Sequence, residues 1–296
     1  MYNIQKRSVM NRFIKKTRVQ PFIIPKPEQE ALVYQEDREA FFYDKLHQHE
    51  ELQISYILQG EGTLIVGDSV NTYQKNDILI IGGNIPHVFK SDLEATSDSV
   101  MFTLFFTEDA FGKSFFQISD LEEAKDFFTL AQYGMKITHN HDKIIAIFEK
   151  LHKQSKIERI ASLLQIIDRC LSVKYKPLSS FVYGKKYTDD EGKRMRDVFE
   201  HAMENFHNQI TLEEVALKAN MTKNAFCRYF KKRTNKTFFQ FLIEIRIENS
   251  CKLLYKNSEM PIAVVSELCG FQNITNFNRK FKELKGVTPS QYRTQF

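Results

Sequence analysis

The sequence predicts an α+β fold, in which a β-rich N-terminal part is followed by helices, and three observations support it. Short β-type runs separated by turn residues follow one another from Phe41 to about Phe106. After Ser119 the apolar residues recur at helical spacing instead. Towards the C-terminus the pattern Phe-x-Arg-x-Phe-Lys occurs twice, because "FCRYFK" from Phe226 and "FNRKFK" from Phe277 match at an offset of 51 residues.

The composition is that of an ordinary globular chain. For 296 residues, about two domains are expected. No apolar run approaches the roughly 18 residues that cross a membrane, and the first residues lack the apolar core of a secretion signal. A cytoplasmic protein without a membrane partner is therefore expected. The four cysteines form no C-x-x-C pair, so we expect reduced thiols rather than a zinc site or disulfides.

The positive charge is concentrated in the C-terminal third. From Asp190 onward the chain has 18 Lys and Arg against 12 Asp and Glu, whereas the first 189 residues have 24 against 25. A basic balance of this kind favours a polyanionic partner such as nucleic acid.

The β-rich part, assigned to residues 20–118, predicts an antiparallel sandwich or small barrel. The runs "LQISYIL", "TLIVG" and "DILIIGG" are followed by the turn segments "QGEG", "DSVNTY" and "NIPH", and "SVMFTLFF" comes after them.

Residues 119–176 are predicted to be helical. An apolar stripe runs along the last of these helices, and it either packs onto its own domain or forms the interface of a homodimer. The stripe consists of Ile157, Ile160, Leu164, Ile167 and Leu171. Residues 177–189 are predicted to form a linker, which ends in the cap-like pair Thr188 and Asp189.

Two helix-turn-helix units are predicted within residues 190–296. Each has a first helix, a tight turn and a capped second helix. The caps and turns are Thr211, Asn220 and Thr222 in the first unit, and Pro261, Gly270 and Asn273 in the second.

In each second helix, two phenylalanines four residues apart are expected to face the core, so the arginine between them faces outward. These arginines are Arg228 and Arg279. The second helix of such a unit enters the DNA major groove. The 18 residues "FFQFLIEIRIENSCKLLY" between the units predict a helix, about 27 Å long. A spacer of this size could place two recognition helices about one DNA turn, roughly 34 Å, apart.

From about Lys193 to Phe296 the chain resembles the DNA-binding domain of the AraC/XylS family of bacterial transcription regulators. The resemblance is carried by "ITLEEVA", "FCRYFKK", "RIENSCKLL", "CGF", "FNRKFKELKG" and "TPSQYR". It implies two helix-turn-helix subdomains, joined by a long helix, that bind successive major-groove segments of double-stranded DNA. Ser250 departs from the pattern, since the family usually has Ala at this position of the linking helix.

The resemblance also implies which residues contact DNA. The expected base-contacting residues are Asn224, Cys227, Arg228, Thr275, Asn276, Asn278 and Arg279. The other candidate DNA-binding residues are Thr222, Lys223, Lys231, Asn273 and Lys282, of which Lys231 and Lys282 are the candidates for phosphate contacts.

A cluster of histidines is predicted in the β-rich part. In "HQHEELQISYILQGEG" the residues His47, His49 and Gln53 are odd-numbered and would share one face of a strand, and His87 could join them. The spacing resembles that of the cupin fold, whose enzymes bind a divalent metal through three His and one Glu. Here Gln53 takes the place of the Glu, which weakens any site for a hard ion. The cluster could line a small-molecule pocket, bind a metal, or consist of ordinary hydrogen-bonded core histidines.

The sequence therefore predicts a transcription regulator, taken to be an activator, that is not an enzyme and needs no cofactor and no metal. Cupin-like sensor domains commonly accompany AraC-type DNA-binding domains, and the resemblance implies a small-molecule effector, often a carbohydrate. RNA polymerase and a second copy of the chain are the other expected partners. The alternative is a metal-dependent cupin enzyme with a DNA-binding tail.

Overall fold

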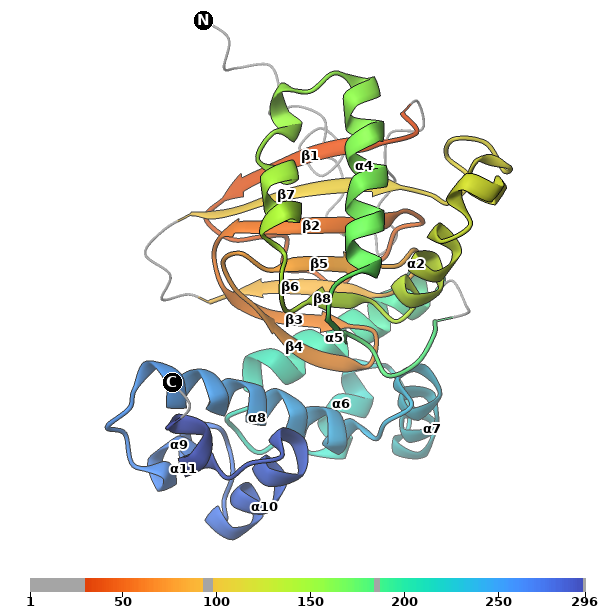
Figure 1. Ribbon diagram of the computed structural model, residues 1–296. Coiled ribbons are helices and arrows are strands. Elements are labelled where there is room, and N and C mark those ends of the chain that lie inside the picture. The colour runs from red at the N-terminus through yellow and green to blue at the C-terminus, as the bar shows by residue number, and fades with distance from the viewer. Residues whose placement is uncertain (1–29, 93–97, 184–186, 295–296) are drawn as a thin grey trace, which may run out of the picture.

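A β-rich N-terminal domain and a helical C-terminal domain make up the computed structural model, which describes residues 30–92, 98–183 and 187–294 (Figure 1). The predicted start of the sensor domain at residue 20 and residues 184–186 of the predicted linker lie outside the described residues. The predicted α+β fold class is confirmed.

The N-terminal domain consists of two antiparallel sheets. One has six strands in the order β1-β7-β2-β5-β8-β9, and the other has three in the order β4-β3-β6. In the centre of the larger sheet, Gln53 of β2 lies opposite Ile81 of β5 and Phe105 of β7. The strands are β1 Val33–Glu39, β2 Leu52–Gln59, β3 Gly62–Val66, β4 Ser69–Tyr73, β5 Ile78–Ile81, β6 His87–Ser91, β7 Ser99–Phe106, β8 Met135–Ile137 and β9 Tyr175–Pro177.

Successive side chains of a strand point to opposite faces of a sheet, and in the central strands β2, β5 and β7 of the six-stranded sheet the side chains of both faces are buried. One face packs against the three-stranded sheet, where Leu79 and Met101 meet Leu64 and Phe89. The other face is covered by the helices α2 Ala124–Ala131, α3 Asp142–Phe148 and α4 Lys156–Leu171 (Figure 1). Short 3-10 helices lie at Phe115–Gln117, Ser119–Leu121 and Leu151–Lys153.

Helix α4 packs onto its own sheet through a face that only partly coincides with the predicted apolar stripe. Its start is stabilised by a capping box between Ser155 and Glu158. Ile167 of the stripe is buried, whereas Leu164 is half-buried and Ile157 is 81% exposed. The Ile167 end of the stripe therefore packs onto its own domain, whereas the Ile157 end is exposed, and a homodimer interface there stays a prediction.

The segment predicted to be purely helical also contributes two strands. Ile137 of β8 lies opposite Ile78, and Tyr175 of β9 lies opposite Ile137, so both strands extend the larger sheet. Three-residue strands carry too short a pattern to be recognised from sequence. The predicted linker is also packed at its start, because Leu178 is buried and its N–H donates to the Gly134 carbonyl at 3.1 Å.

The C-terminal domain has seven helices among its described residues. They are α5 Asp189–Asn205, α6 Leu212–Lys218, α7 Lys223–Thr234, α8 Phe238–Lys256, α9 Ile262–Leu268, α10 Ile274–Lys285 and α11 Pro289–Arg293. The 19-residue helix α8 joins two cores, since Phe241 and Ile245 pack with α5 to α7 while Cys251 and Leu254 pack with α9 and α10. Among the described helices, none combines the length and the apolar character that crossing a membrane requires.

Candidate nucleic-acid interface and histidine cluster

The first helix-turn-helix unit consists of α6 and α7. Thr211 forms a capping box with Glu214 at the start of α6, and the Thr222 hydroxyl accepts from the Ala225 N–H at the start of α7. Between the helices Asn220 has a φ of 52°, which reverses the chain. The predicted caps and turn of this unit are thus confirmed.

The second unit consists of α9 and α10 and follows the same plan. Pro261 stands at the cap position of α9, and the Asn273 side chain accepts from the Thr275 and Asn276 N–H groups at the start of α10. The turn needs a glycine for two reasons: Gly270 has a φ of +81°, and a Cβ there would lie 2.5 Å from the Phe206 carbonyl oxygen.

Both second helices bury their paired phenylalanines, as the spacing predicts. Phe226, Phe230, Phe277 and Phe281 are 0% exposed. The opposite faces of α7 and α10 are consequently open to solvent. All twelve candidate DNA-binding residues are exposed: Thr222, Lys223, Asn224, Cys227, Arg228, Lys231, Asn273, Thr275, Asn276, Asn278, Arg279 and Lys282.

Neighbouring side chains orient two of these cations. Lys223 pairs with Glu213 of α6, and this hydrogen bond lowers the pKa of the Glu213 carboxyl. Arg279 donates to the Asn276 side chain at 2.9 Å and lies 3.6 Å from a Glu283 oxygen. Arg279 is therefore held on the outer face of α10, between Asn276 and Glu283.

The serine that departs from the family pattern in α8 fits its site. Ser250 is fully buried, and its hydroxyl donates to the Ile247 carbonyl at 2.7 Å. The buried hydroxyl thus has its hydrogen bond, which explains why a small polar residue is tolerated there.

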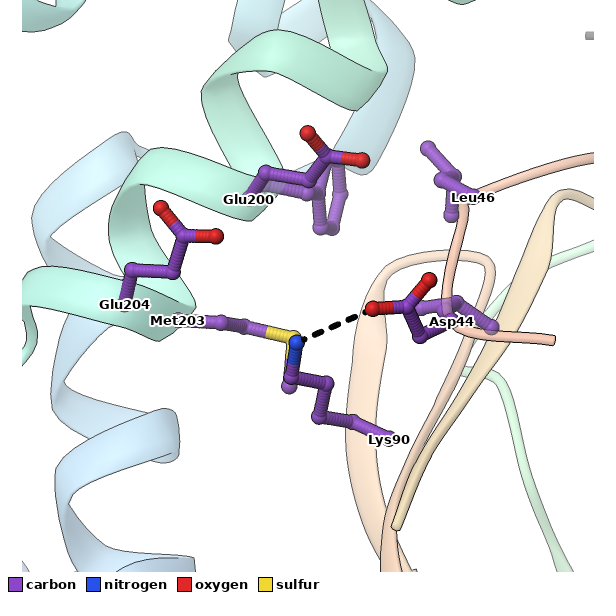
Figure 2. A pocket seen from close by; sticks show the side chains of 8 residues that line it. Asp44, Leu46, Lys90, Glu200, Met203 and Glu204 are labelled. Carbon is purple, nitrogen blue, oxygen red and sulfur yellow. Dashed lines mark hydrogen bonds and ion pairs between the residues drawn. The ribbon is translucent and has the colours of Figure 1, made fainter. Parts of the chain in front are cut away.

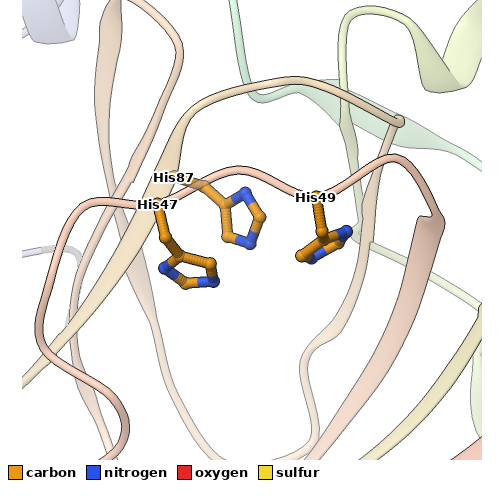
Figure 3. Close-up of side chains that lie close together, drawn as sticks. All are labelled: His47, His49 and His87. Atoms are coloured by element: carbon orange, nitrogen blue, oxygen red, sulfur yellow. The ribbon is translucent and has the colours of Figure 1, made fainter. Parts of the chain in front are cut away.

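Three histidines converge inside the N-terminal domain (Figure 3). The ring of His87 lies 4.3 Å from that of His47 and 4.9 Å from that of His49, and all three residues are buried. Their convergence does not come from a shared strand face. His47 and His49 precede β2, and His47 is placed by an isolated bridge to His87, with backbone N···O distances of 3.0 and 2.9 Å.

The same hydrogen-bond pattern orients each imidazole. The Nδ1 atoms of His47, His49 and His87 lie 2.8 Å from the carbonyls of Lys45, Glu51 and Ile85 respectively. A carbonyl can only accept, so Nδ1 carries a proton in each ring, and the neutral rings of His47 and His87 then present the lone pair of Nε2.

A chain of hydrogen-bonded polar side chains begins at His49 and leads through Gln53 into the domain. The Gln53 amide oxygen lies 3.2 Å from His49 Nε2, and its amide nitrogen donates at 2.8 Å to the Ser55 hydroxyl, which lies 2.9 Å from that of Thr103. Both ring nitrogens of His49 therefore face an oxygen, the Glu51 carbonyl and the Gln53 amide oxygen. Donors and acceptors in series suit a ligand that carries hydroxyl groups.

The donor atoms of the three histidines also have the spacing of a metal site. One ligand atom from each residue lies within 4.8 Å of the other two. Three imidazoles with protonated Nδ1 atoms suit a borderline metal such as zinc, nickel or iron. All three ligands are neutral, however, and Gln53 supplies no charge. The Glu51 carboxylate lies 3.7 Å from His49 Nδ1, so it could offset the charge of a bound dication only through the imidazole and not as a ligand.

From the sequence, Tyr56, Phe89 and Phe102 are the aromatic residues expected near this cluster, where each could stack on a ligand or fill the core. Tyr56 and Phe102 belong to the core under the helices, on the opposite face of the sheet, whereas the ring of Phe89 lies 6.5 Å from that of His87. Two further rings beside the histidines are Phe105, 5.3 Å from His49, and Tyr43, 5.0 Å from His47. Phe105 had no distinguishing signal, since only the register of its strand decides which face it occupies, and Tyr43 lies outside the strands.

Sequence reasoning also missed contacts on the outer side of the histidines. Arg196 of α5 donates to the Leu46 carbonyl at 2.9 Å, and the Gln48 amide donates to the Tyr187 carbonyl at 3.4 Å. Both acceptors are main-chain oxygens, so the residue types leave no signal in the sequence.

Known proteins match both domains. Residues 215–295 match the helix-turn-helix domain family, and residues 39–101 match the cupin domain family. The uncharacterized HTH-type transcriptional regulator YdeC of Bacillus subtilis is 24% identical over 259 residues, which cover 85% of this chain and 86% of YdeC. The MmsAB operon regulatory protein of Pseudomonas aeruginosa is 32% identical over 90 residues, which cover 30% of this chain and 29% of that protein.

Solved structures match the C-terminal domain as well. The DNA-binding domain of AdpA, in complex with a target DNA, is 28% identical with a TM-score of 0.33, and the match covers 35% of this chain and 92% of that one. On its two domain matches and its relatives, the chain combines a cupin domain with a following helix-turn-helix domain of the AraC type, and it is similar to HTH-type transcriptional regulators.

Proposed function

We propose that this chain is a transcription activator that binds specific DNA sequences through both helix-turn-helix units and is controlled by a small-molecule effector. The observation that carries the proposal is the doubled surface on α7 and α10, where all twelve candidate residues are exposed while the paired phenylalanines are buried. The base-contacting residues are Asn224, Cys227, Arg228, Thr275, Asn276, Asn278 and Arg279.

The effector site is the histidine cluster with Gln53. Buried imidazoles followed by an amide and two hydroxyls offer alternating donors and acceptors, which suit a polyhydroxylated molecule such as a carbohydrate. The protein is not an enzyme in this proposal, because Gln53 occupies the position from which a carboxylate ligand would compensate the charge of a catalytic metal.

The partners follow from this role. Double-stranded DNA is bound in the cytoplasm, RNA polymerase is recruited, and two chains associate through the exposed end of the α4 stripe around Ile157. A homodimer would present four helix-turn-helix units to a repeated operator.

The decisive experiment is genome-wide mapping of the DNA that the full-length protein binds, followed by binding titrations on the recovered sequences. Enrichment of a recurring sequence motif, with affinity that falls steeply as salt rises, is expected. Uniform binding to all sequences would rule out specific recognition. The genes beside the bound sites then supply candidate effectors for titration against the wild type and a Gln53→Leu variant.

A further inference from the structure

The DNA-binding domain is docked on the three-stranded sheet of the cupin domain. Ile65, Val70 and Val88 of that sheet share one apolar core with residues of α5 and α8, among them Phe199 and Leu242. Contact between the domains is thus extensive, and it includes the side of the cupin domain on which the histidines lie.

The short segment that carries the first histidines makes direct polar contacts with this docked domain. We call residues 44–48 the coupling segment. Its Leu46 carbonyl accepts from Arg196 of α5 at 2.9 Å, and its Lys45 ammonium lies 3.2 Å from Glu200, also on α5. Figure 2 shows Asp44 and Leu46 of the segment facing Glu200 across a small pocket between the domains.

On its other side the coupling segment is fixed by the histidine cluster. The imidazole of His47 donates from Nδ1 to the Lys45 carbonyl at 2.8 Å. The His47 backbone pairs with His87. The His47 ring therefore cannot turn without breaking its hydrogen bond to the Lys45 carbonyl. Lys45 directly precedes Leu46, whose carbonyl accepts from Arg196.

Helix α5 in turn contacts the first helix-turn-helix unit. The ring of Phe199 lies 6.1 Å from that of Phe230 in α7, and Arg233 of α7 pairs with Glu191 of α5. A shift of α5 would therefore move the recognition helix α7 relative to the cupin domain.

We propose that Arg196 is a positioning residue that couples the histidine cluster to the DNA-binding domain through the coupling segment. This inference rests on the proposed effector site. A ligand that binds the imidazoles acts by turning His47, which changes the hydrogen bond between Leu46 and Arg196 and thereby the docking of α5. A ligand can shift a conformational equilibrium only through such a difference in contacts between states.

The test is a double-mutant cycle on the full-length protein, measured by amide hydrogen exchange of α5. His47→Ala should raise exchange in α5 about tenfold, the change that corresponds to losing one hydrogen bond of about 1.4 kcal/mol. In the Arg196→Met variant, His47→Ala should raise the exchange of α5 little further, because the hydrogen bond between Arg196 and Leu46 is already lost. Additive effects, or no response of α5 to His47→Ala, would overturn the proposal.

Two matched controls separate coupling from general loosening. His139→Ala replaces an exposed histidine outside the cluster, and Lys193→Met replaces an exposed cation of α5. Neither should change exchange in α5 in the way that His47→Ala does. Exchange in β7 reports whether the cupin domain is intact; if His47→Ala unfolds it, His47→Gln completes the same cycle with the same criteria.

This outcome is separable from that of the proposed function. The cycle is read without DNA and without an effector, so it can fail while specific DNA binding stands. Conversely, if the wild-type protein binds no specific DNA sequence, the proposed regulatory function is refuted, but the coupling measured by hydrogen exchange still stands.

Discussion

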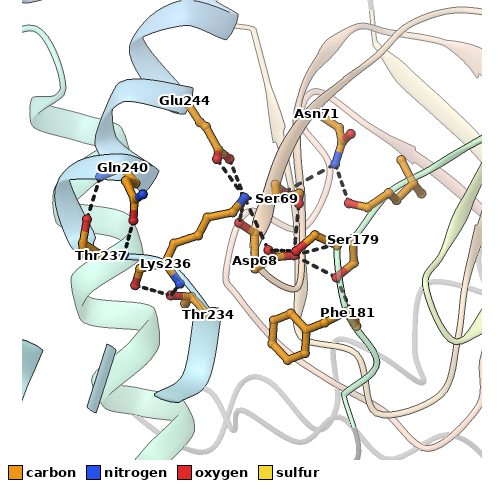
Figure 4. Close-up of polar contacts among 12 residues, drawn as sticks. Asp68, Ser69, Asn71, Ser179, Phe181, Thr234, Lys236, Thr237, Gln240 and Glu244 are labelled. Carbon is orange, nitrogen blue, oxygen red and sulfur yellow. Dashed lines mark hydrogen bonds and ion pairs between the residues drawn. The ribbon is translucent and has the colours of Figure 1, made fainter. Parts of the chain in front are cut away.

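The ammonium of Lys236 lies 2.9 Å from the carbonyl oxygen of Asp68 and 3.4 Å from its carboxylate, which joins the DNA-binding domain to the turn between β3 and β4 (Figure 4). Asp68 is fully buried, and Glu244 lies 2.9 Å from the same ammonium. The Asp68 carboxylate also accepts from Ser179 and Ser180, so it ties the start of the linker to the same point.

This network predicts a pH dependence of stability. Burial by itself would raise the pKa of Asp68, but hydrogen bonds from Ser180 and the charge of Lys236 outweigh it and hold the pKa below its usual value. The stabilisation is therefore present above the ordinary aspartate pKa of about 3.9, and it is lost as pH falls through the lower folded pKa. Asp68→Asn should remove this acid-sensitive contribution to stability and lower the free energy of unfolding by about 3 kcal/mol at neutral pH.

Urea unfolding of the wild type and Asp68→Asn between neutral and acid pH measures this difference. Burial and, to a smaller extent, the charge of Asp68 raise the pKa of the Glu244 carboxyl, so in Asp68→Asn the Glu244 titration moves to lower pH and must be fitted separately for the two proteins. The control is Glu122→Gln, which removes an exposed ion pair with Lys125 and should leave the free energy of unfolding nearly unchanged. If the difference in the free energy of unfolding between wild type and Asp68→Asn stays constant down to acid pH, the Asp68 carboxylate is not the source of the pH dependence.

Arg228→Ala and Arg279→Ala should each cost about 1–3 kcal/mol in operator binding and relax the preference at one base position. Both side chains are exposed on the outer face of a recognition helix. Footprinting titrations on the operator and on single-base variants measure both effects. If affinity and base preference survive either substitution, that arginine does not contact bases.

Lys231→Ala and Lys282→Ala are the matched changes one turn further along the same helices. They should weaken binding to all sequences alike and lower the salt dependence of affinity, because a phosphate contact carries no base information. A change in base preference would instead move these lysines into the group that contacts bases.

Purified protein should contain well under one metal ion per chain. The three histidines converge, yet no ligand among them and Gln53 carries a negative charge to balance a buried dication. Elemental analysis measures the content, with His47→Ala as the control. Near-stoichiometric iron, nickel or zinc that disappears in His47→Ala would support the enzyme alternative.

Ile157→Lys with Leu164→Lys should give a folded monomer with greatly reduced affinity for a two-site operator. Ile157 is 81% exposed and Leu164 is half-buried, so charge at these positions opposes a helix pair more than it disturbs the core. Ile167 is unsuitable because it is buried in its own domain. Sedimentation decides: a double variant that stays dimeric, or a wild type that is monomeric, excludes this interface.

The helix-turn-helix units could be predicted in detail from the sequence, because every feature that defines them is local. Thr222 and Asn273 cap helices within three residues of themselves, and Gly270 reverses the chain through its own φ. The pairs such as Phe226 and Phe230 lie on one face by helical spacing alone. Interactions of this range depend little on the rest of the chain.

The tertiary structure decided what depends on distant partners. His47 and His49 could be chosen by residue type, but an isolated bridge to His87, and not a shared strand, brings them together. Sheet register turned Tyr56 towards the helices and Phe105 towards the histidines. The hydrogen bond from Arg196 to the Leu46 carbonyl spans 150 residues and ends on a main-chain oxygen, which every residue has, so no residue type in the sequence could indicate it.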